Sequence, residues 1–255
     1  MKHPISVNSS CESGVCIPSY VVMALSGLVG GVSLILFGSF LYNGLPNQIN
    51  FGLNGSMNLF INALLSLLFF LQHSLMLRKG FRKRLSGFIP PDYLGASFSI
   101  CSGLSLLMLM LFWQKSTSIQ IDFNGALYLL IRFLFFISII GFFFTIRSLR
   151  LFDPLGIRDI SAHLKGKTIR GSLFTVRGPY KSVRHPLYFL SLLMIWTNVS
   201  ITTDRLLFNG IWTVWIIIGT FLEERDLIDS FGDEYRNYQR EVPMLAPYKW
   251  SLWRS

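Results

Sequence analysis

Charged residues are scarce in this chain of 255 residues: they make up 14% of it, whereas hydrophobic residues make up 51%. A typical soluble domain has about 25% charged residues. Between Ser13 and Leu77 there is no Asp, Glu, Lys or Arg at all. This shortage excludes an ordinary soluble domain and indicates segments that lie in a lipid bilayer.

Cysteine is also scarce, and it occurs only as Cys11, Cys16 and Cys101. The sequence has no Cys-x-x-Cys pair and no Cys/His spacing typical of a metal site, so we expect no metal ligands. A disulfide between Cys11 and Cys16 would require an exported N-terminal tail, which the topology below argues against. Cys101 falls within an apolar run and is expected to be a small packing residue.

Long apolar runs are abundant by contrast. A helix needs about 20 residues to cross the roughly 30 Å hydrocarbon core of a bilayer. Four runs of about that length come first, and a shorter pair joined by a tight turn follows. The expected spans are 18–42, 57–77, 94–113, 125–146, 187–202 and 206–222. The predicted fold class is an all-α, polytopic membrane protein with about six membrane helices, ending in a helical hairpin and an amphipathic tail.

The loops differ strongly in positive charge, and this difference predicts their orientation. Loop 78–92 has five Lys and Arg residues and loop 147–184 has nine, whereas loop 43–56 has none and loop 115–124 has one. Cytoplasmic loops are the ones rich in Lys and Arg, so we expect both basic loops and both termini in the cytoplasm. The net charge of +10 is then mostly a topology signal. We expect contact with anionic membrane lipids and no nucleic-acid partner.

Polar side chains gather at the two ends of the last predicted hairpin. Residues 177–188 read RGPYKSVRHPLY, and residues 223–226 read EERD. Because a hairpin brings its ends together, residues 184–185 should lie near residues 223–224. The spacing alone leaves two interpretations open: an ion-pair cluster that anchors the hairpin at the interface, or a functional site.

The tail that follows has apolar side chains at steps of three and four residues, up to Pro243. These side chains are Leu227, Ile228, Phe231, Tyr235, Tyr238 and Val242. The pattern predicts one apolar face of an amphipathic helix. Such a helix fits a position on the membrane surface, and it fits a lid or wall over a cytoplasmic site equally well.

Several motifs in a fixed order carry a family resemblance. RHPLY at 184–188, EERD at 223–226 and FGDEYRNYQREVPMLAP at 231–247 resemble the C-terminal half of the isoprenylcysteine carboxyl methyltransferase superfamily. In the N-terminal half, LQHSLMLRKGFRKR, IPPDYLGASFSI and LFDPLGIRDI resemble its methanethiol S-methyltransferase branch. Together these segments extend the resemblance over most of residues 60–247.

The resemblance implies an integral-membrane methyltransferase with S-adenosyl-L-methionine as its cofactor, held on the cytoplasmic side by the last helices and the tail. Residues 1–150 would form an N-terminal four-helix membrane region, and residues 151–255 a C-terminal cofactor-binding methyltransferase region. The cofactor-binding residues that it implies are Tyr180, His185, Pro186, Leu187, Tyr188 and Glu223. Arg184, which can pair the cofactor carboxylate or neutralise Glu224, and Glu224 itself complete the predicted cofactor site.

Methyl transfer from a sulfonium requires proximity and alignment but no acid, because the leaving group is already positively charged. The aromatic faces of Tyr180 and Tyr188 can hold such a cation. A thiol acceptor reacts as the thiolate, so the predicted catalytic residue is His185, which can titrate near neutral pH; the alternative is a backbone-bonded histidine that shapes the pocket. His73, just before loop 78–92, is the predicted substrate residue, with helix packing as its alternative role.

Position 219 bears on the methyl acceptor. In the carboxyl methyltransferases an arginine four residues before the first glutamate binds the substrate carboxylate, but this chain has Gly219 there and no charge within 215–222. A buried carboxylate without a partner is costly, so we expect a small thiol, methanethiol, that becomes dimethyl sulfide. The alternatives are a lipid or isoprenoid acceptor (an isoprenylcysteine carboxylate or a phospholipid amine), a sterol-reductase-like NADPH enzyme and a non-enzymatic accessory membrane protein.

Overall fold

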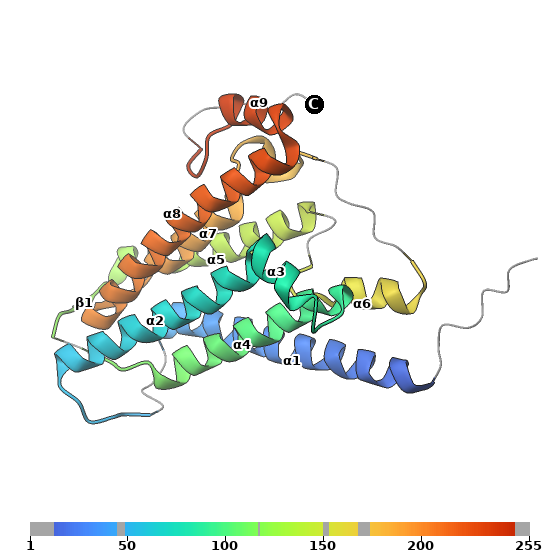
Figure 1. Cartoon of the computed structure of the whole chain (residues 1–255). Helices are drawn as coiled ribbons and strands as arrows, with labels where there is room; N and C mark the ends of the chain where they lie inside the picture. Colours follow the sequence, from blue (N-terminus) through green and yellow to red (C-terminus); the bar gives the residue numbers. More distant parts are fainter. Residues whose placement is uncertain (1–12, 45–48, 117, 150–152, 168–173, 248–255) are drawn as a thin grey trace, which may run out of the picture. The chain divides into compact units, whose positions relative to one another are not determined.

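The computed structural model describes residues 13–44, 49–116, 118–149, 153–167 and 174–247, and for residues 13–17 only the backbone. The expectations for Cys11 and Cys16 lie outside the described side chains. The elements in chain order are α1 (Ser13–Asn43), α2 (Gly55–Leu77), α3 (Lys79–Leu85), η1 (Pro91–Tyr93), α4 (Leu94–Phe112), β1 (Gln120–Asp122), α5 (Gly125–Ser148), α6 (Ile157–Leu164), η2 (Gly178–Lys181), α7 (Pro186–Trp196), β2 (Ser200–Thr202), α8 (Thr203–Phe231) and α9 (Asp233–Glu241) (Figure 1).

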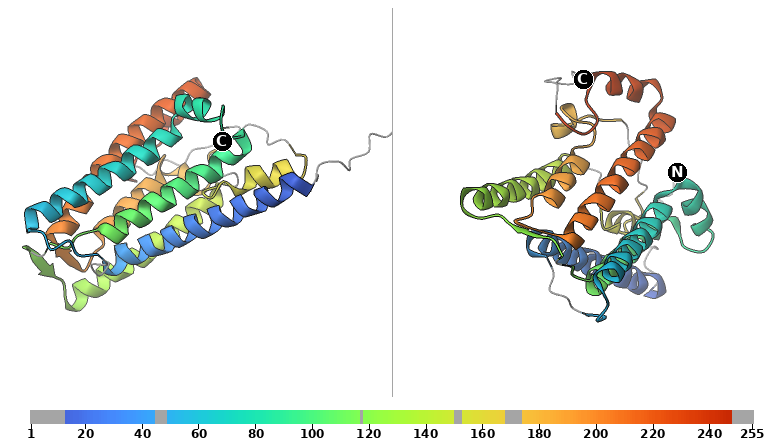
Figure 2. Two further views of the ribbon diagram at one scale, coloured as in Figure 1. Left: turned by 60° about the horizontal axis from the view of Figure 1, so that its bottom comes forward. Right: turned by 90° about the vertical axis from the view of Figure 1, so that its left-hand side faces the viewer.

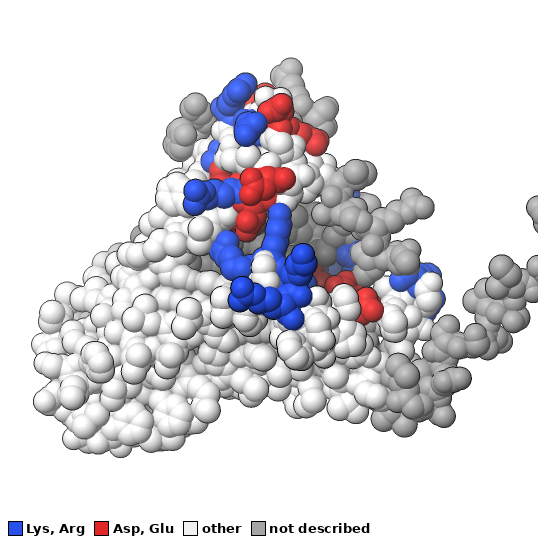
Figure 3. Space-filling view, in the orientation of Figure 1, with Lys and Arg blue, Asp and Glu red and all other residues white. Residues whose placement is uncertain are grey.

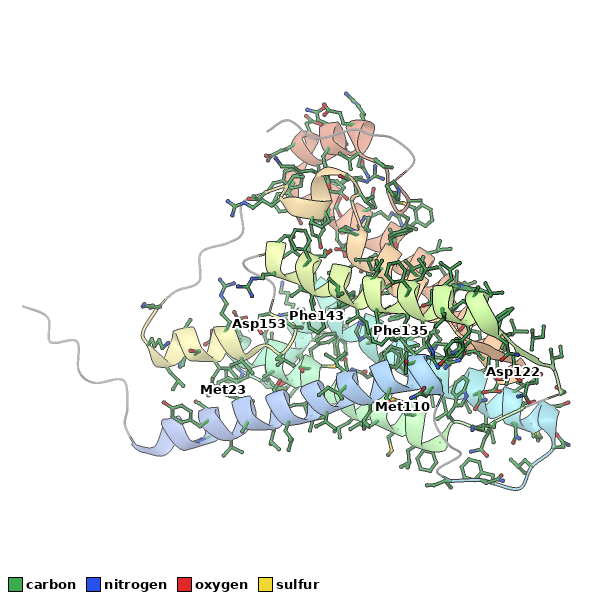
Figure 4. All side chains as sticks on the ribbon, turned by 180° about the vertical axis from the view of Figure 1, so that it is seen from behind. Met23, Met110, Asp122, Phe135, Phe143 and Asp153 are labelled. Carbon is green, nitrogen blue, oxygen red and sulfur yellow. The ribbon has the colours of Figure 1, made fainter. Side chains whose placement is uncertain are left out.

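Within the described residues, five helices are long and apolar enough to cross a membrane. They cover Pro18–Asn43, Gly55–Leu77, Pro91–Phe112, Gly125–Ser148 and Thr203–Phe231. Large apolar side chains lie on their surfaces: on α5, Phe143 is 68% exposed, whereas Phe135 is 2% exposed and packs on Tyr42 (Figure 4). An apolar surface of this kind suits lipid contact. The all-α, polytopic membrane fold predicted from the sequence is therefore confirmed.

The segment 187–202, predicted as one membrane helix, has a different secondary structure. Helix α7 ends at Trp196 after 11 residues, which is about 16 Å of helix and half of a bilayer core. Residues 200–202 form β2, which pairs antiparallel with β1, the strand that precedes α5 in the chain. The prediction of a helix over all of 187–202 is wrong, because the residues after Trp196 are not helical and the last three form β2.

Helix α7 packs along α5 (Figure 1 and Figure 2), and the non-helical residues that follow α7 lead into β2. Non-helical backbone at membrane depth is tolerated where protein covers it. Thr197 and Asn198 are each 5% exposed, and the Asn198 side chain donates to the carbonyl oxygen of Leu41 at 3.2 Å.

The structure divides into two compact units, each made of separate stretches of chain. One contains 1–37, 68–108 and 153–171, and the other contains 38–67, 109–152 and 172–255. The chain passes from one unit to the other within α1, α2 and α4. The functional division into residues 1–150 and 151–255 stays a prediction.

The first unit contains α3, η1 and α6. Short polar contacts tie its parts together: the Ser26 hydroxyl donates to the carbonyl oxygen of Leu155 at 2.5 Å, and His163 pairs with Asp92 at 2.9 Å. Lys and Arg side chains gather over α3 on the face that Figure 3 shows. These basic residues come from loop 78–92, for which the sequence predicts a cytoplasmic position.

The second unit contains α5, α7, α8 and α9. At the start of α8, Asp204 accepts hydrogen bonds from the Trp113 indole at 2.9 Å and the Ser116 backbone at 3.1 Å. Arg205 donates to the carbonyl oxygen of Phe40 at 2.6 Å. Both charged side chains are buried. The tight turn expected at TTDR (202–205) is instead the end of β2 and the start of α8.

Candidate functional site

The motif segments of the C-terminal half converge in the second unit. The backbone of 184–185 runs beside 243–244: the Arg184 N–H donates to the Pro243 carbonyl at 2.9 Å, and the His185 N–H to the Met244 carbonyl at 3.0 Å. Pro186 then begins α7, where its missing N–H costs no hydrogen bond. The RHPLY motif is therefore held against the VPMLAP segment.

Glu224 is the centre of this convergence, and its carboxylate accepts five hydrogen bonds from described residues. Its side chain is buried at 8% exposure. Arg184 donates from Nε to Oε1 at 2.9 Å and from Nη2 to Oε2 at 3.1 Å. The Tyr235 hydroxyl donates to Oε1 at 2.7 Å, His185 Nε2 lies 2.7 Å from the same oxygen, and Gln239 donates to Oε2. We call Arg184, His185, Glu224, Tyr235 and Gln239 the Glu224 junction.

Arg184 ties this junction to the end of α9. Its Nη1 donates to the carbonyl oxygens of Gln239 at 2.8 Å and Val242 at 2.6 Å, while its Nε and Nη2 donate to Glu224. A bidentate guanidinium–carboxylate pair is among the stronger polar contacts. Of the two roles that the sequence leaves open for Arg184, the structure shows the pairing with Glu224.

His185 lies between the two glutamates of α8. Its ring is 5% exposed and stacks on Tyr188 at a centroid distance of 5.5 Å. While Nε2 faces Glu224, Nδ1 faces Glu223 at 3.7 Å from Oε2. The Glu223 side chain is 44% exposed. The hairpin therefore brings 184–185 and 223–224 together, as predicted.

Tyr180 lies in η2, directly before this motif. Burial raises the pKa of its phenol above the usual range, and the negative charge of Glu223 raises it further. Its carbonyl oxygen accepts a hydrogen bond from the Tyr238 hydroxyl at 2.5 Å. The phenol of Tyr180 is thus neutral near Glu223, and α9 fixes the backbone of η2.

The tail is not one continuous helix. Helix α8 runs on to Phe231, and Gly232, with a positive φ of 57°, breaks it before α9. An L side chain at this φ would be strained. The break turns Tyr235 toward Glu224, and burial together with the carboxylate raises the pKa of Tyr235 above its usual range.

The apolar face predicted for the tail is present and covered by protein. It forms a cluster with residues of the loop before α7: Phe174, Val176, Tyr180, Leu227, Ile228, Phe231, Tyr235, Tyr238 and Val242. Of the two expected uses of this face, a wall beside the site fits these contacts. Figure 3 shows charged side chains over α9 and the end of α8, whereas the visible face over the first part of α8 has none.

The sequence did not single out the contacts of Tyr235, Tyr238 and Gln239, although these residues stand in the motif segment 231–247. Their spacing suggested only an apolar face.

The remaining predicted site residues lie in different places. Pro186 is buried and Leu187 half-buried at the start of α7. His73 belongs to the other unit, where its ring contacts Phe69 and Phe98 at centroid distances of 5.3 and 4.9 Å.

The residues at this site suit an organic cation better than a metal. The described part of the chain has no group of three or more His, Cys, Asp or Glu side chains that could hold a metal ion. The Glu223 side chain is half-exposed and lies 3.7 Å from His185 Nδ1, and the His185 ring stacks on Tyr188. A half-exposed carboxylate can bind hydroxyl and amino groups, and aromatic faces can hold a sulfonium.

Comparison with known proteins gives the family. The chain is 35% identical over 207 residues to methanethiol S-methyltransferase 2 of Bradyrhizobium diazoefficiens, covering 79% of each chain. It is 33% identical over 211 residues to methanethiol S-methyltransferase of Pseudomonas deceptionensis, covering 80% of this chain and 79% of the relative. Methanethiol S-methyltransferase of Mycobacterium tuberculosis is 31% identical over 192 residues, 74% of this chain and 78% of that one.

No protein-family model and no solved structure matches the chain. The similarity to the three transferases nevertheless extends over about three quarters of the sequence or more, and the long apolar helices are those of an integral membrane protein. This chain therefore belongs to the methanethiol S-methyltransferase family and is a membrane methyltransferase.

Proposed function

We propose that the chain transfers the methyl group of S-adenosyl-L-methionine to methanethiol and releases dimethyl sulfide, at the site formed by residues 180–188 and 223–224. The observation that carries the proposal is the convergence of the motif segments on Glu223, Glu224 and His185, in a chain 31–35% identical to named methanethiol S-methyltransferases. The methyl donor and its binding residues are part of the proposal.

The side chains present fit S-adenosyl-L-methionine. When bound, it supplies a methyl group activated by a positively charged sulfur. Glu223, with its half-exposed carboxylate, would accept hydrogen bonds from the amino group or the ribose hydroxyls. Tyr180 and Tyr188 would offer aromatic faces to the sulfonium, and Pro186 and Leu187 would shape the site at the start of α7.

Arg184 and Glu224 would hold the site in shape without touching the cofactor. The four hydrogen bonds that the Arg184 side chain donates to described residues end on Glu224 or on the carbonyl oxygens of Gln239 and Val242. Because reaction rate depends on alignment of the two reactants, this buried junction would serve catalysis by fixing His185 and the first turn of α7.

The acceptor assignment rests on Gly219 as well as on the relatives. Gly219 lies one helical turn before Glu223, and a Cβ added there would have no atom within 4 Å. The space at this position is open and, within α8 from 215 to 222, no cation faces it. A neutral thiol entering this region needs no charged partner, whereas a carboxylate would.

The site would face the cytoplasm. It lies at the end of α7 that follows loop 147–184, which has nine Lys and Arg residues, and such loops stay on the cytoplasmic side. Supply of S-adenosyl-L-methionine, a charged and water-soluble metabolite, would then come directly from that compartment.

Detergent-purified protein mixed with S-adenosyl-L-methionine and methanethiol tests the proposal through the dimethyl sulfide in the headspace. We expect product that requires both reactants, and little methylation of a farnesylated cysteine in the same preparation. Faster methylation of the farnesylated carboxylate, by protein that binds the methyl donor, would overturn the thiol assignment.

A further inference from the structure

The Glu224 junction determines which nitrogen of His185 carries a proton. The forked contact with Arg184 keeps the Glu224 carboxylate ionised, and an ionised carboxylate can only accept hydrogen bonds. Because His185 Nε2 lies 2.7 Å from Glu224 Oε1, Nε2 must be the donor. The neutral imidazole then carries its lone pair on Nδ1.

Nδ1 is directed away from the junction. It lies 3.7 Å from Glu223 Oε2, which is too far for a hydrogen bond, and in the described part of the chain no other group bonds to it. The ring is buried and stacked on Tyr188, and the His185 N–H bond to the Met244 carbonyl holds the backbone. The lone pair therefore has a fixed direction, on the side of the half-exposed Glu223.

We infer that Nδ1 of His185 is the atom that takes the proton from the thiol, and that Glu224 is the positioning residue that presents this atom by holding Nε2. The inference rests on the proposed function and adds its proton acceptor. As the S–H bond breaks, Nδ1 gains the proton and the sulfur keeps the electron pair. That pair forms the new S–CH₃ bond while the bond from the methyl carbon to the donor sulfur breaks.

The charges around His185 suit this step. The groups that face its ring from the neighbouring elements are Arg184 before α7, Tyr188 on α7, Glu223 and Glu224 on α8, and Tyr235 on α9. Arg184 already neutralises Glu224. Once Nδ1 is protonated, the positive imidazolium would lie beside the otherwise unneutralised carboxylate of Glu223. The imidazolium would then return its proton to water.

Replacement of His185 with Gln tests the roles of the two ring nitrogens separately. The Gln amide can still donate to Glu224 in the place of Nε2, but it has no titratable atom in the place of Nδ1. We expect His185→Gln to bind S-adenosyl-L-methionine within about threefold of wild type by calorimetry. Its kcat for methanethiol should fall by about a hundredfold or more, as expected for loss of a general base. His163→Gln, an exposed substitution in the other unit, is the matched control.

The pH profile distinguishes loss of a base from loss of structure. A cysteine thiol has a pKa of about 8.5, and methanethiol, which lacks the electron-withdrawing groups of cysteine, is a weaker acid. Without a base the rate therefore follows the small fraction of thiolate already present in solution. His185→Gln should therefore gain about tenfold in kcat/KM per pH unit from pH 6 to pH 8. The wild-type profile should rise less steeply, because its proton acceptor is part of the protein. The defect of His185→Gln should also be smaller with hydrogen sulfide, which is more acidic than methanethiol.

A second measurement needs no turnover. Nitrogen NMR of protein labelled with ¹⁵N-histidine reports the tautomer of each ring, and the His185 signals are those missing from His185→Gln. We expect wild-type His185 to carry its proton on Nε2. Glu224→Gln should release this fixed tautomer, whereas Glu234→Gln, an exposed change on α9, should not.

Three results would overturn the inference. The first is a kcat of His185→Gln within threefold of wild type. The second is a tenfold loss of S-adenosyl-L-methionine affinity in that variant, since His185 would then hold the cofactor. The third is a wild-type tautomer protonated at Nδ1. Failure of the proposed function is distinguishable from all of these, because wild type would then form no dimethyl sulfide while the NMR result still reports the geometry.

Discussion

Glu223 and Glu224 follow each other on α8, yet His185 lies between their carboxylates with one ring nitrogen toward each. Nε2 is 2.7 Å from Glu224, and Nδ1 is 3.7 Å from Glu223. The Glu224 side chain is 8% exposed and the Glu223 side chain 44%. Adjacent residues on a helix point about 100° apart, so one carboxylate enters the buried junction and the other is half-exposed.

Replacement of Glu223 with Gln should weaken the binding of S-adenosyl-L-methionine without unfolding the protein. A hydrogen bond to a charged group is worth about 1.5–3 kcal/mol, so the dissociation constant should rise about tenfold or more. The half-exposed side chain accepts no hydrogen bond from other described residues, so the melting temperature should change little. Calorimetry on the variant and on Glu234→Gln measures the first effect; equal affinities would place the cofactor elsewhere.

Replacement of Arg184 with Lys should act on stability first. Lysine cannot reproduce the fork to Glu224 together with the two bonds to the end of α9. Loss of a hydrogen bond to a charged group costs about 1.5–3 kcal/mol. We expect a clear drop in the melting temperature of the detergent-purified protein, read by intrinsic fluorescence. Arg236→Lys, whose partner Asp233 is exposed, is the control, and a similar melting temperature for both variants would contradict the buried role of Arg184.

Gly219→Arg tests the acceptor side of the site. The open space at this position should accommodate the side chain, so the variant should fold. We expect no gain in methanethiol turnover, because a neutral thiol has no use for the cation. A variant that methylated methanethiol several times faster would show that the acceptor is bound as an anion at this position.

The orientation can be checked by cysteine labelling in intact cells. In a variant without its own three cysteines, Ser86→Cys after α3 should be shielded from a membrane-impermeant maleimide, since loop 78–92 is basic. Gln120→Cys in β1, at the opposite end of α4, should be labelled. Labelling of Ser86→Cys from outside would reverse the topology.

The sequence predicted the long helices and the meeting of 184–185 with 223–224, because apolar length and hairpin geometry alone determine both. It could not predict that α7 ends at Trp196, since the backbone of residues 197–202 depends on the burial of Thr197 and Asn198 and on the pairing of β2 with β1. The buried Asp204 likewise depends on Trp113, which is 91 residues away in the chain.

The different surroundings of Glu223 and Glu224 could not be predicted from the sequence either. Both were predicted to bind the cofactor, because adjacent carboxylates look alike in a sequence until their partners are known. Tyr235 and Gln239 reach Glu224 only because Gly232 breaks the helix and turns α9 back on α8. The spacing of Tyr235 and Tyr238 indicated an apolar face, and the hydroxyl contacts came from the tertiary structure.

The most direct test of the central claim follows the methyl group itself. Purified protein is given S-adenosyl-L-methionine with a deuterated methyl group and unlabelled methanethiol, and the mass of the dimethyl sulfide in the headspace is measured. We predict dimethyl sulfide with one deuterated methyl group, formed by wild type and strongly reduced in Glu223→Gln at low cofactor concentration. Absence of labelled dimethyl sulfide, from folded protein supplied with both reactants, would contradict S-adenosyl-L-methionine-dependent methylation of methanethiol.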